Sequence, residues 1–417
     1  MNIAIIGGGA AGMMVAATLC ERNLKAVIHI FEKNPSLGKK VLISGGGRCN
    51  VTTGYTDTHL VESKYVRGSL FLRPAMAAFG PEKVFQWFEA HGVPLKNEED
   101  FRVFPRSDQG KDVVTVFEKL FAKYDVQVHF SEPVTAIVKQ GDGRFELVTA
   151  KRSEMMDVVV ITTGGNAYRH TGSTGDGYDF AKACGHTITQ LGPSLNSFEV
   201  KETWCKELSG ISLPAASLVG VDPKTEVITG PFLFTHFGIS GPMVFAFSAH
   251  IPFATITPQH PLSVRLYPLG YNNFDYWEHA LLSLFHQNTA KSVANILRTL
   301  LPKRLVAELL LLSGISESHT CHQLPKALRR KLVHLLSGEL RLTLLARRPG
   351  DEFVTAGGVC LDEVNRKTLE SKCCPNLYFG GEVLDVDGVT GGFNLQVAWA
   401  TGRLVGETIA KKLKVES

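Results

Sequence analysis

The chain has 417 residues and a formal net charge of +4, with 44% hydrophobic and 20% charged residues. This composition is that of an ordinary globular protein and excludes a largely disordered one, while the length predicts two or three domains. No run of eighteen apolar residues is present, so we expect no membrane-spanning helix, and so small a charge does not by itself indicate nucleic acid.

The first 32 residues have the pattern of a nucleotide-binding βαβ unit. The run 3–6 predicts a strand, GGGAAG at 7–12 opens a helical pattern, and 27–31 predicts a second strand that leads to Glu32. The three spaced glycines of such a unit allow a tight turn, backbone approach to a pyrophosphate and close packing of helix on strand. The acid accepts from ribose hydroxyls, which also disfavours the 2′-phosphate of NADP. We therefore expect a bound dinucleotide.

A second glycine-rich segment, SGGGRCN at 44–50, follows where an NAD dehydrogenase would continue with further βαβ units. Three consecutive glycines are costly because each loses more backbone freedom on folding than any other residue. The segment is not a Walker loop, since no GK[ST] ends it, and no cysteine stands five residues after Cys49 as in disulfide reductases. It predicts a second backbone wall along a long cofactor, which favours FAD over NAD.

Residues 1–192 are expected to form the N-terminal part of this domain. Apolar spacing predicts helices at 81–91, 112–124 and 177–184, and strands at 126–130, 134–138, 145–150 and 157–161. The last strand runs into paired glycines and a polar loop that contains RHTGSTGD.

The middle of the chain is expected to be an insert. Residues 193–270 carry short β-branched runs and predict a β-rich subdomain, and 271–347 predict a helical subdomain with Leu-rich stretches that extend to 345. Residues 271–348 hold eleven Lys and Arg against five Asp and Glu. We interpret this surplus as a solvated helix face rather than a nucleic-acid surface, because no aromatic or RNA motif is interleaved.

The C-terminal segment 348–417 is expected to return to the first domain. In LYFGGEVLDVDGVTGGFNLQVAWATG at 377–402, a strand ends at GGE and a long helix begins after the second glycine pair. An acid at that strand end suits a ribityl hydroxyl, and a helix start suits the electron-rich edge of a flavin. The prediction is an α/β fold: a Rossmann-like FAD-binding domain built from both chain ends, with an inserted β-rich plus helical region.

Six motifs together resemble one family. GGGAAG, SGGGRCNVT, TGSTGDGY, FTHFGISGP, TAGGV and GGEVLDVDGVTGGFNLQ are similar to those of the bacterial aminoacetone-oxidase-like, bile-acid-dehydrogenase-like FAD flavoproteins. The resemblance spans nearly the whole chain and implies non-covalent FAD and oxidoreductase activity. Relatives often have Ser-Tyr-Pro after the paired glycines, whereas this chain has Ala-Tyr-Arg at 167–169, so substrate specificity does not transfer.

The motifs and the resemblance imply a set of cofactor-binding residues. The adenosine end would lie on the first glycine turn, the acid after the second strand and the start of the 134–138 strand. The 44–50 segment would line the pyrophosphate and flavin, and the C-terminal motif the ribityl chain and ring. The expected residues are Gly7, Gly9, Ala11, Gly12, Glu32, Lys33, Gly47, Arg48, Cys49, Asn50, Val134, Gly165, Gly381, Glu382, Gly392, Asn394 and Leu395.

Three residues are candidates for contact with substrate. His236, in the FTHFGISGP loop, is a candidate acid, base or anchor because imidazole titrates near neutral pH, although a histidine satisfied within the fold is the commoner outcome. Tyr168 and Arg169 are candidates to polarise or clamp a carbonyl or carboxylate. Cys49 is expected to pack rather than react, since no second cysteine is placed to resolve it. We expect no metal site, because the histidines lack ligand spacing.

The leading interpretation is an FAD-dependent oxidoreductase that transfers a hydride between FAD and an amine or an enoyl or carbonyl compound. No second strand–GxGxxG–helix unit is present, so oxygen, a quinone or transient NAD(P)H remains open as redox partner. Competing interpretations are an NAD(P)H-dependent ene-reductase, a flavin-bound RNA-interacting protein and a plain NAD dehydrogenase. With no signal peptide and no disulfide framework among the eight cysteines, a cytoplasmic protein is expected.

Overall fold

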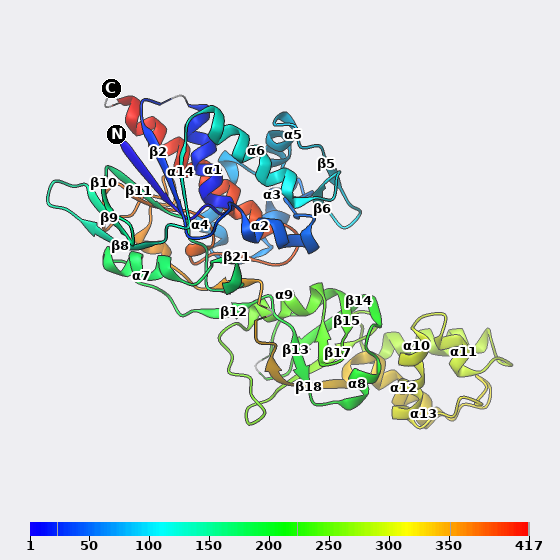
Figure 1. Ribbon diagram of the computed structural model, residues 1–417. Coiled ribbons are helices and arrows are strands. Elements are labelled where there is room, and N and C mark those ends of the chain that lie inside the picture. The colour runs from blue at the N-terminus through cyan, green and yellow to red at the C-terminus, as the bar shows by residue number, and fades with distance from the viewer. Residues whose placement is uncertain (23, 223, 351, 416–417) are drawn as a thin grey trace. The chain divides into compact units, whose positions relative to one another are not determined.

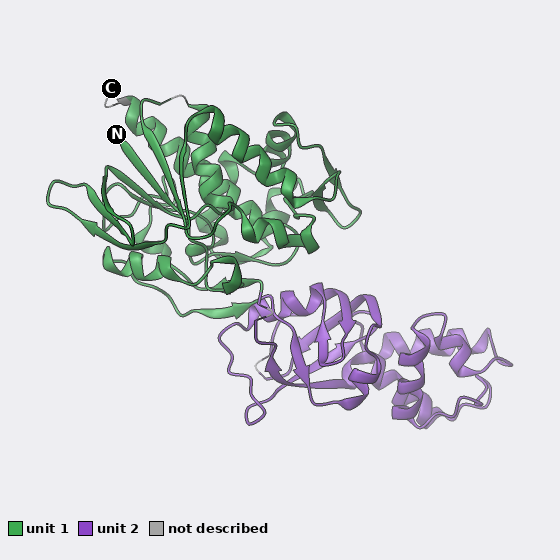
Figure 2. Cartoon of the chain, in the orientation of Figure 1, with its two compact units in different colours: residues 1–194, 353–417 green, residues 195–352 purple. Residues whose placement is uncertain are grey.

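We describe the protein from a computed structural model, which describes residues 1–22, 24–222, 224–350 and 352–415. The chain divides into two compact units (Figure 2). Unit 1 consists of residues 1–194 and 353–417, and unit 2 of residues 195–352. The expected FAD-binding domain built from both chain ends is therefore confirmed as unit 1.

Unit 1 is organised around a parallel sheet of five strands (Figure 1). Its order is β20-β11-β1-β2-β7, with every neighbouring pair parallel. The strands β1, β2 and β11 are rich in β-branched apolar residues, which is typical of parallel strands that are buried on both faces of a sheet. The strands are β1 (Asn2–Ile6), β2 (Val27–Glu32), β7 (Gln127–Phe130), β11 (Val158–Ile161) and β20 (Leu377–Phe379).

One face of the sheet packs against the first and last helices of unit 1. A Cβ placed on Gly402 of α14 would lie 2.5 Å from the carbonyl oxygen of Ala11 in α1, so glycine lets these two helices touch. The helices of this unit are α1 (Ala10–Glu21), α2 (Lys39–Ile43), α3 (Thr58–Glu62), α4 (Ser69–Ala78), α5 (Pro81–Ala90), α6 (Gly110–Lys123), α7 (Asp176–Ala183) and α14 (Phe393–Val415). Within the described residues, no helix combines the length and apolar character that crossing a bilayer requires.

Antiparallel strands complete unit 1. One sheet of three strands, in the order β10-β9-β8, supplies Glu154, whose carboxylate lies near His29 of β2. Smaller sheets join β3, β6 and β5, then β4 and β21, then β12 and β19. Their bounds are β3 (Thr52–Thr53), β4 (Tyr65–Arg67), β5 (Leu95–Asn97), β6 (Arg102–Pro105), β8 (Val134–Lys139), β9 (Phe145–Thr149), β10 (Ser153–Met156), β12 (Gly192–Ser194), β19 (Val354–Ala356) and β21 (Asp387–Gly388).

Unit 2 contains a closed barrel of six strands in the order β13-β16-β15-β14-β17-β18. Closure removes exposed strand edges, and the barrel interior is filled by apolar side chains. The strands are β13 (Phe198–Val200), β14 (Ser212–Gly220), β15 (Ile228–Phe234), β16 (Gly238–Ser240), β17 (Leu262–Tyr267) and β18 (Leu340–Arg347).

The helices of unit 2 differ from the sequence prediction at one end. They are α8 (Thr203–Glu207), α9 (Pro242–His250), α10 (Phe274–His286), α11 (Val293–Leu297), α12 (Lys303–Ser313) and α13 (Lys326–His334). The prediction that the helical pattern continues to 345 is wrong, because 340–347 forms the last barrel strand. In LRLTLLAR the side chains alternate between buried and more exposed positions from Leu340 to Leu344, which is the period of a strand.

Candidate functional site

The loop between β1 and α1 leaves an open cradle. Gly9 precedes α1 with an extended backbone and no side-chain cap, and a Cβ placed on it would meet no described atom within 4 Å. The first N–H groups of a helix have no intrahelical partner, and they carry partial positive charge. By contrast, a Cβ on Gly12 would lie 2.0 Å from the carbonyl oxygen of Gly7. Gly12 therefore serves packing, whereas Gly9 leaves room for an anion.

Glu32 lies beside this cradle. Its carboxylate is buried, and one oxygen accepts the Gly8 N–H at 2.8 Å while the other accepts from the backbone and side chain of Asn34 at 2.8 and 2.7 Å. A carboxylate has about four lone-pair directions, so acceptor capacity remains for hydroxyl donors. Val134 starts β8 nearby, since the Glu132 N–H donates to the carbonyl of Glu32.

Lys33 is held by the TGSTGD motif. Its ammonium lies 2.5 Å from both the Thr174 hydroxyl and an Asp176 oxygen. Burial raises the pKa of Asp176, but these contacts outweigh burial, so the pKa is lowered. The lysine thus links the end of β2 to the loop before α7. The ammonium of Lys33 therefore lies beside this loop and does not extend freely into solvent.

The C-terminal motif meets this region from the other side. Glu382 accepts the Thr355 N–H at 3.0 Å with one oxygen and pairs with Lys40 at 2.9 Å through the other. A Cβ on Gly165 would lie 2.7 Å from the Glu382 carboxylate. Similarly, a Cβ on Gly381 would lie 3.0 Å from the Cβ of Ala11. Segments from both chain ends therefore converge here, as the motifs predicted.

Lys40 and Thr355 were not among the expected site residues. Both contact Glu382, whose role was expected. Thr355 lies in the TAGGV motif, so that motif held a signal that residue-by-residue reasoning did not use. Lys40 follows a second lysine in a plain surface-like run, and nothing in its local sequence distinguishes it.

The three glycines at 45–47 adopt a conformation that side chains disfavour. Their φ angles are 57°, 71° and 89°, all in the left-handed region. An L-residue with a side chain is strained there, so this turn requires glycine for backbone reasons as well as for space. A Cβ on Gly46 would meet no described atom within 4 Å, so the outer side of the turn is open.

Arg48 and Asn50 flank Cys49 and contact the neighbouring β6 sheet. The Arg48 guanidinium pairs with Glu98 at 2.8 Å and stacks 3.8 Å from the ring centroid of Phe104. The Asn50 side-chain oxygen accepts the Val103 N–H at 3.2 Å. These contacts hold the 44–50 turn, so the two residues act on the turn's position, and direct contact with a cofactor stays a prediction.

Cys49 is a buried thiol. Its side chain is fully buried, and burial raises the pKa of Cys49 to about 12 despite a hydrogen bond with Ser44. At pH 8 we expect iodoacetamide to modify Cys49 in the native protein at least about a thousandfold more slowly than in the same protein unfolded in guanidinium, because only the thiolate reacts. Mass spectrometry of the peptide that contains Cys49 measures both rates. Comparable rates would contradict an inert role.

The start of α14 is organised by Asn394. Its amide oxygen accepts the Gly388 N–H at 2.9 Å and its amide nitrogen donates to the Gly388 carbonyl at 2.8 Å. The side chain therefore fastens the loop, and contributions of Asn394 and Leu395 to a ligand would come from their first-turn N–H groups. A Cβ on Gly392 would lie 2.3 Å from the Thr52 carbonyl, which joins this helix start to the strand after the 44–50 turn.

The three candidate substrate residues lie in different surroundings. Tyr168 has φ of 54° and stacks on Phe353 with centroids 5.4 Å apart, and Arg169 is exposed and donates to Asn166 at 2.6 Å. Both belong to unit 1. His236 belongs to unit 2, where it is exposed and packs edge-on against Phe237 at 5.1 Å.

The residues of unit 1 fit an FAD molecule. Gly9 provides an open position beside a helix start, Glu32 has spare acceptor capacity, and Glu382 offers a second acid beside the converging segments. Two helix starts, α1 and α14, supply N–H donors for negative charge. This donor set suits a pyrophosphate flanked by two hydroxyl-bearing chains.

Known proteins that this chain resembles include three relatives matched over nearly their full length, and one family model also matches. The family described as HI0933-like protein Rossmann domain matches residues 1–408. A 3-dehydro-bile acid delta(4,6)-reductase of Clostridium scindens is 31% identical over 417 residues, with 99% of each chain covered. The ribosomal RNA dihydrouridine synthase of Haemophilus influenzae is 28% identical, covering 98% of each chain, and that of Escherichia coli is 29% identical, covering 95% of each chain.

Solved structures with low identity share the fold. The FrdA subunit of E. coli quinol fumarate reductase has a TM-score of 0.52 at 15% identity, covering 100% of this chain and 71% of that one. A 3-ketosteroid delta1-dehydrogenase from Sterolibacterium denitrificans has a TM-score of 0.51 at 10% identity, covering 98% of this chain and 99% of that one. At such identities the likeness concerns the fold alone.

Proposed function

The chain belongs to the HI0933-like Rossmann-domain family of FAD-dependent oxidoreductases, and we propose that it transfers a hydride from reduced FAD to a C=C bond conjugated with a carbonyl group. The observation that carries this proposal is the pair of activities named for its full-length relatives. By their names, one reduces delta(4,6) double bonds of a 3-dehydro steroid, and the other converts uridine to dihydrouridine. Both activities saturate a C=C bond that a carbonyl polarises.

Several residues of the chain would hold the cofactor in this reaction. Bound FAD supplies the hydride. Glu32 would accept from the ribose hydroxyls, and the open position at Gly9 would admit the pyrophosphate beside the first turn of α1. Glu382, which pairs with Lys40 at 2.9 Å, would accept from the ribityl chain. The same cofactor-binding residues would serve an amine oxidase equally well, but the relatives' names favour the reductase.

Saturation of a conjugated C=C bond also needs a polarised carbonyl and a proton at the neighbouring carbon. We assign the first task to Arg169 and the second to Tyr168, which both lie in unit 1, as proposals that rest on residue chemistry. The strained backbone of Tyr168 supports its assignment, because an aromatic residue at φ of 54° persists only where its surroundings hold it there.

An anaerobic half-reaction experiment tests the proposed function. FAD-loaded protein is first reduced with NADH or NADPH and then mixed with a 3-oxo-Δ4 steroid, the matching saturated ketone or a primary amine. We expect the absorbance of oxidised flavin to return with the enone only, because only the enone has an electron-poor carbon to accept the hydride. A separate anaerobic sample of oxidised protein is mixed with the amine. Bleaching of that sample, together with no return of oxidised flavin when the reduced protein meets the enone, would contradict the proposal and favour the oxidase.

A uridine in ribosomal RNA is the second candidate substrate. Two relatives carry that activity in their names, and exposed cations gather on α12 and α13, namely Lys303, Arg304, Lys326, Arg330 and Lys331. Such cations suit a phosphate backbone. In the same experiment a ribosomal RNA transcript replaces the steroid. Return of oxidised flavin with RNA and not with the enone, together with dihydrouridine detected by mass spectrometry, would select this substrate.

A further inference from the structure

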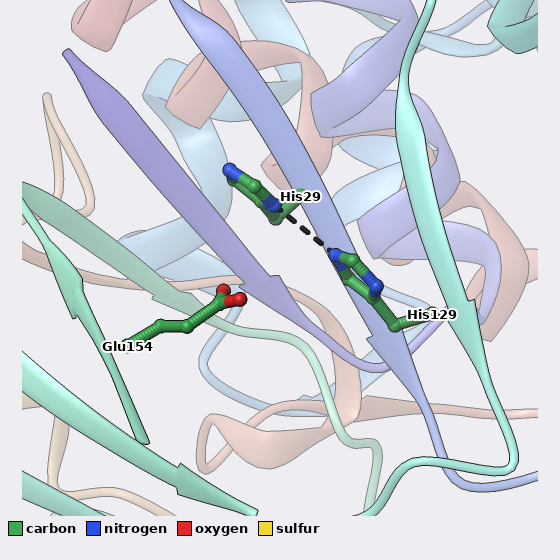
Figure 3. A group of neighbouring side chains, drawn as sticks. All are labelled: His29, His129 and Glu154. Carbon is green, nitrogen blue, oxygen red and sulfur yellow. Dashed lines mark hydrogen bonds between the residues drawn. The ribbon is translucent and has the colours of Figure 1, made fainter. Parts of the chain in front are cut away.

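One group of potential metal ligands lies between two sheets of unit 1, and its hydrogen bonds argue against a metal (Figure 3). His29 of β2, His129 of β7 and Glu154 of β10 each bring one ligand atom within 4.8 Å of the others. Arg152 lies 3.0 Å from His129 Nδ1, and a guanidinium can only donate, so that nitrogen accepts. Burial lowers the pKa of His129, and the neutral ring then carries its proton on Nε2, which faces His29 Nδ1 at 3.1 Å. Both nitrogens of His129 are therefore engaged within the protein.

A cavity of unit 1 offers different chemistry. Its volume is about 650 Å³, and residues from two segments that are far apart in the chain, 68–71 and 361–372, line it. None of the lining residues is among those expected to hold the cofactor. Small ligands occupy pockets of roughly 300–1,000 Å³, so this space, which we call the 68–372 cavity, has the size of a ligand site.

Three cations and one acid line the 68–372 cavity. Arg366, Lys367 and Lys372 are exposed, as is the acid, Asp362. Within the part of the chain that the structure describes, no ion pair engages Arg366 or Lys367. Lys372 donates to the backbone carbonyl of Asp362 at 2.8 Å, which holds its ammonium at the loop and leaves two of its three N–H groups for another acceptor. The cavity therefore has a surplus of positive charge.

The other segment adds hydrogen-bond donors to the same cavity. Helix α4 begins at Ser69, after Gly68, with no side-chain cap and no acid in its first turn. Its first intrahelical hydrogen bond runs from the Leu72 N–H to the Gly68 carbonyl. The N–H groups of residues 69–71 therefore have no partner within the helix, and they carry partial positive charge. Side-chain cations and backbone donors from independent segments thus converge, which favours an anion.

Apolar side chains form the rest of the lining. Val364 is buried, Phe71 and Leu361 are half-buried, and Leu70 is 62% exposed. Covering such surface is favourable by about 25 cal/mol for each Å² removed from water. An inorganic anion would leave the apolar part of the lining uncovered. The lining suits a molecule that has an anionic end and a flat, less polar end.

We propose that the 68–372 cavity binds a phosphorylated nucleoside, with its phosphates on Arg366, Lys367 and the start of α4. Phosphate oxygens accept hydrogen bonds from guanidinium, ammonium and helix N–H groups alike. The base would pack against Phe71 and Leu361, because an aromatic ring offers a face to another flat ring. An adenine nucleotide and a nicotinamide dinucleotide share this chemistry. The site does not depend on the reaction proposed above.

Calorimetric titration of the FAD-loaded protein tests this site, since bound FAD fills the other nucleotide site. ATP, NADP⁺ and uncharged adenosine are separate titrants. We expect ATP or NADP⁺ to bind once per chain and adenosine not to bind, because it lacks the phosphates. The tighter of the two nucleotides identifies the source. The proposal would be overturned if neither bound with a Kd below about 1 mM, or if adenosine bound as tightly as they do.

Paired variants locate the binding. Arg366→Gln combined with Lys367→Gln removes two exposed cavity cations, so flavin content should be unchanged while affinity for the nucleotide falls at least about tenfold. Lys119→Gln combined with Lys123→Gln is the matched control, because it removes the same charge from exposed positions on α6. Its affinity should stay within about twofold of the wild type. Equal losses in both pairs, or no loss in the cavity pair, would refute the assignment.

Photolabelling gives a readout that does not depend on charge. An 8-azidoadenine derivative of the tighter nucleotide is irradiated with the FAD-loaded protein, which is then digested and analysed by mass spectrometry. We expect the label on peptides that contain residues 68–71 or 361–372, and an excess of the unmodified nucleotide should prevent labelling. A label found only on other peptides would place the nucleotide elsewhere and end the proposal.

Discussion

Replacement of Gly9 by valine is expected to abolish most FAD binding while the apoprotein still folds. The Gly9 backbone is extended, with φ of −79° and ψ of −172°, and valine adopts this conformation readily. A Cβ there meets no described atom within 4 Å, so the side chain enters only the space assigned to the pyrophosphate. We expect FAD affinity to fall at least about a hundredfold, or roughly 2.7 kcal/mol, in a fluorescence titration of the apoprotein.

Gly141→Val is the matched control. Gly141 lies in the turn between β8 and β9, is not among the positive-φ glycines, and a Cβ placed on it likewise meets no described atom within 4 Å. This variant should bind FAD like the wild type and melt at a similar temperature. If Gly9→Val bound FAD within a few-fold of the control, the pyrophosphate would lie elsewhere and the cofactor assignment at this turn would be wrong.

Removal of Arg67 is expected to be the most destabilising single change that we describe. Arg67 pairs with Asp387 through two N···O contacts of 2.5 Å, and the Asp387 side chain is fully buried. Ser194 donates a further hydrogen bond to the same carboxylate at 2.9 Å. Arg67→Met leaves a buried charge without its cation, which costs about 3–5 kcal/mol of unfolding free energy. Denaturant titration measures this loss.

Arg73→Met is the control for loss of an arginine as such. Arg73 makes a similar two-point pair with Glu62 at 3.0 and 2.9 Å, but its side chain is 53% exposed. Exposed pairs contribute about 0–1 kcal/mol, so this variant should stay close to the wild type. Equal losses in the two variants would contradict the role assigned to burial.

The loss of unfolding free energy in Arg67→Met should also depend on pH. Burial raises the pKa of Asp387, and Arg67 opposes that rise, so removal of the arginine lets the pKa rise further. A group whose folded-state pKa is raised contributes stability that is present at low pH and lost as the pH rises through that pKa. The difference in unfolding free energy between variant and wild type should therefore become smaller from pH 7 to pH 5. A deficit that is constant over this range would show that Asp387 does not titrate there.

Sequence patterns were sufficient for the nucleotide-binding unit. The strand, glycine turn, helix and second strand were predicted from local periodicity and appear as β1, α1 and β2 within a residue or two. These features depend on residues that are neighbours in the chain, where a 3.6-residue spacing of apolar side chains indicates a helix and a two-residue spacing indicates a strand. The pattern failed at 340–347, where a Leu-rich segment has the composition of the preceding helices but pairs with β13 and β17 as a strand of the barrel.

The site residues divide in the same way. The glycine turns and the position of Glu32 at the end of β2 could be predicted because each depends on residues that are neighbours in the chain, and their contacts with a cofactor stay predictions. Arg48 was expected to face the cofactor, whereas Glu98 and Phe104, fifty residues onward, hold its guanidinium.

From the chain alone one can derive a dinucleotide fold assembled from its two ends, since glycine turns, helix starts and strand-end acids carry their chemistry locally. Which charges neutralise one another follows only from folding. Asp387 and Arg67 are 320 positions apart, and their pairing depends on the burial that the packed unit imposes. Burial and long-range pairing are properties of the assembled core, because the free energy of a charge depends on the groups that exclude water from it.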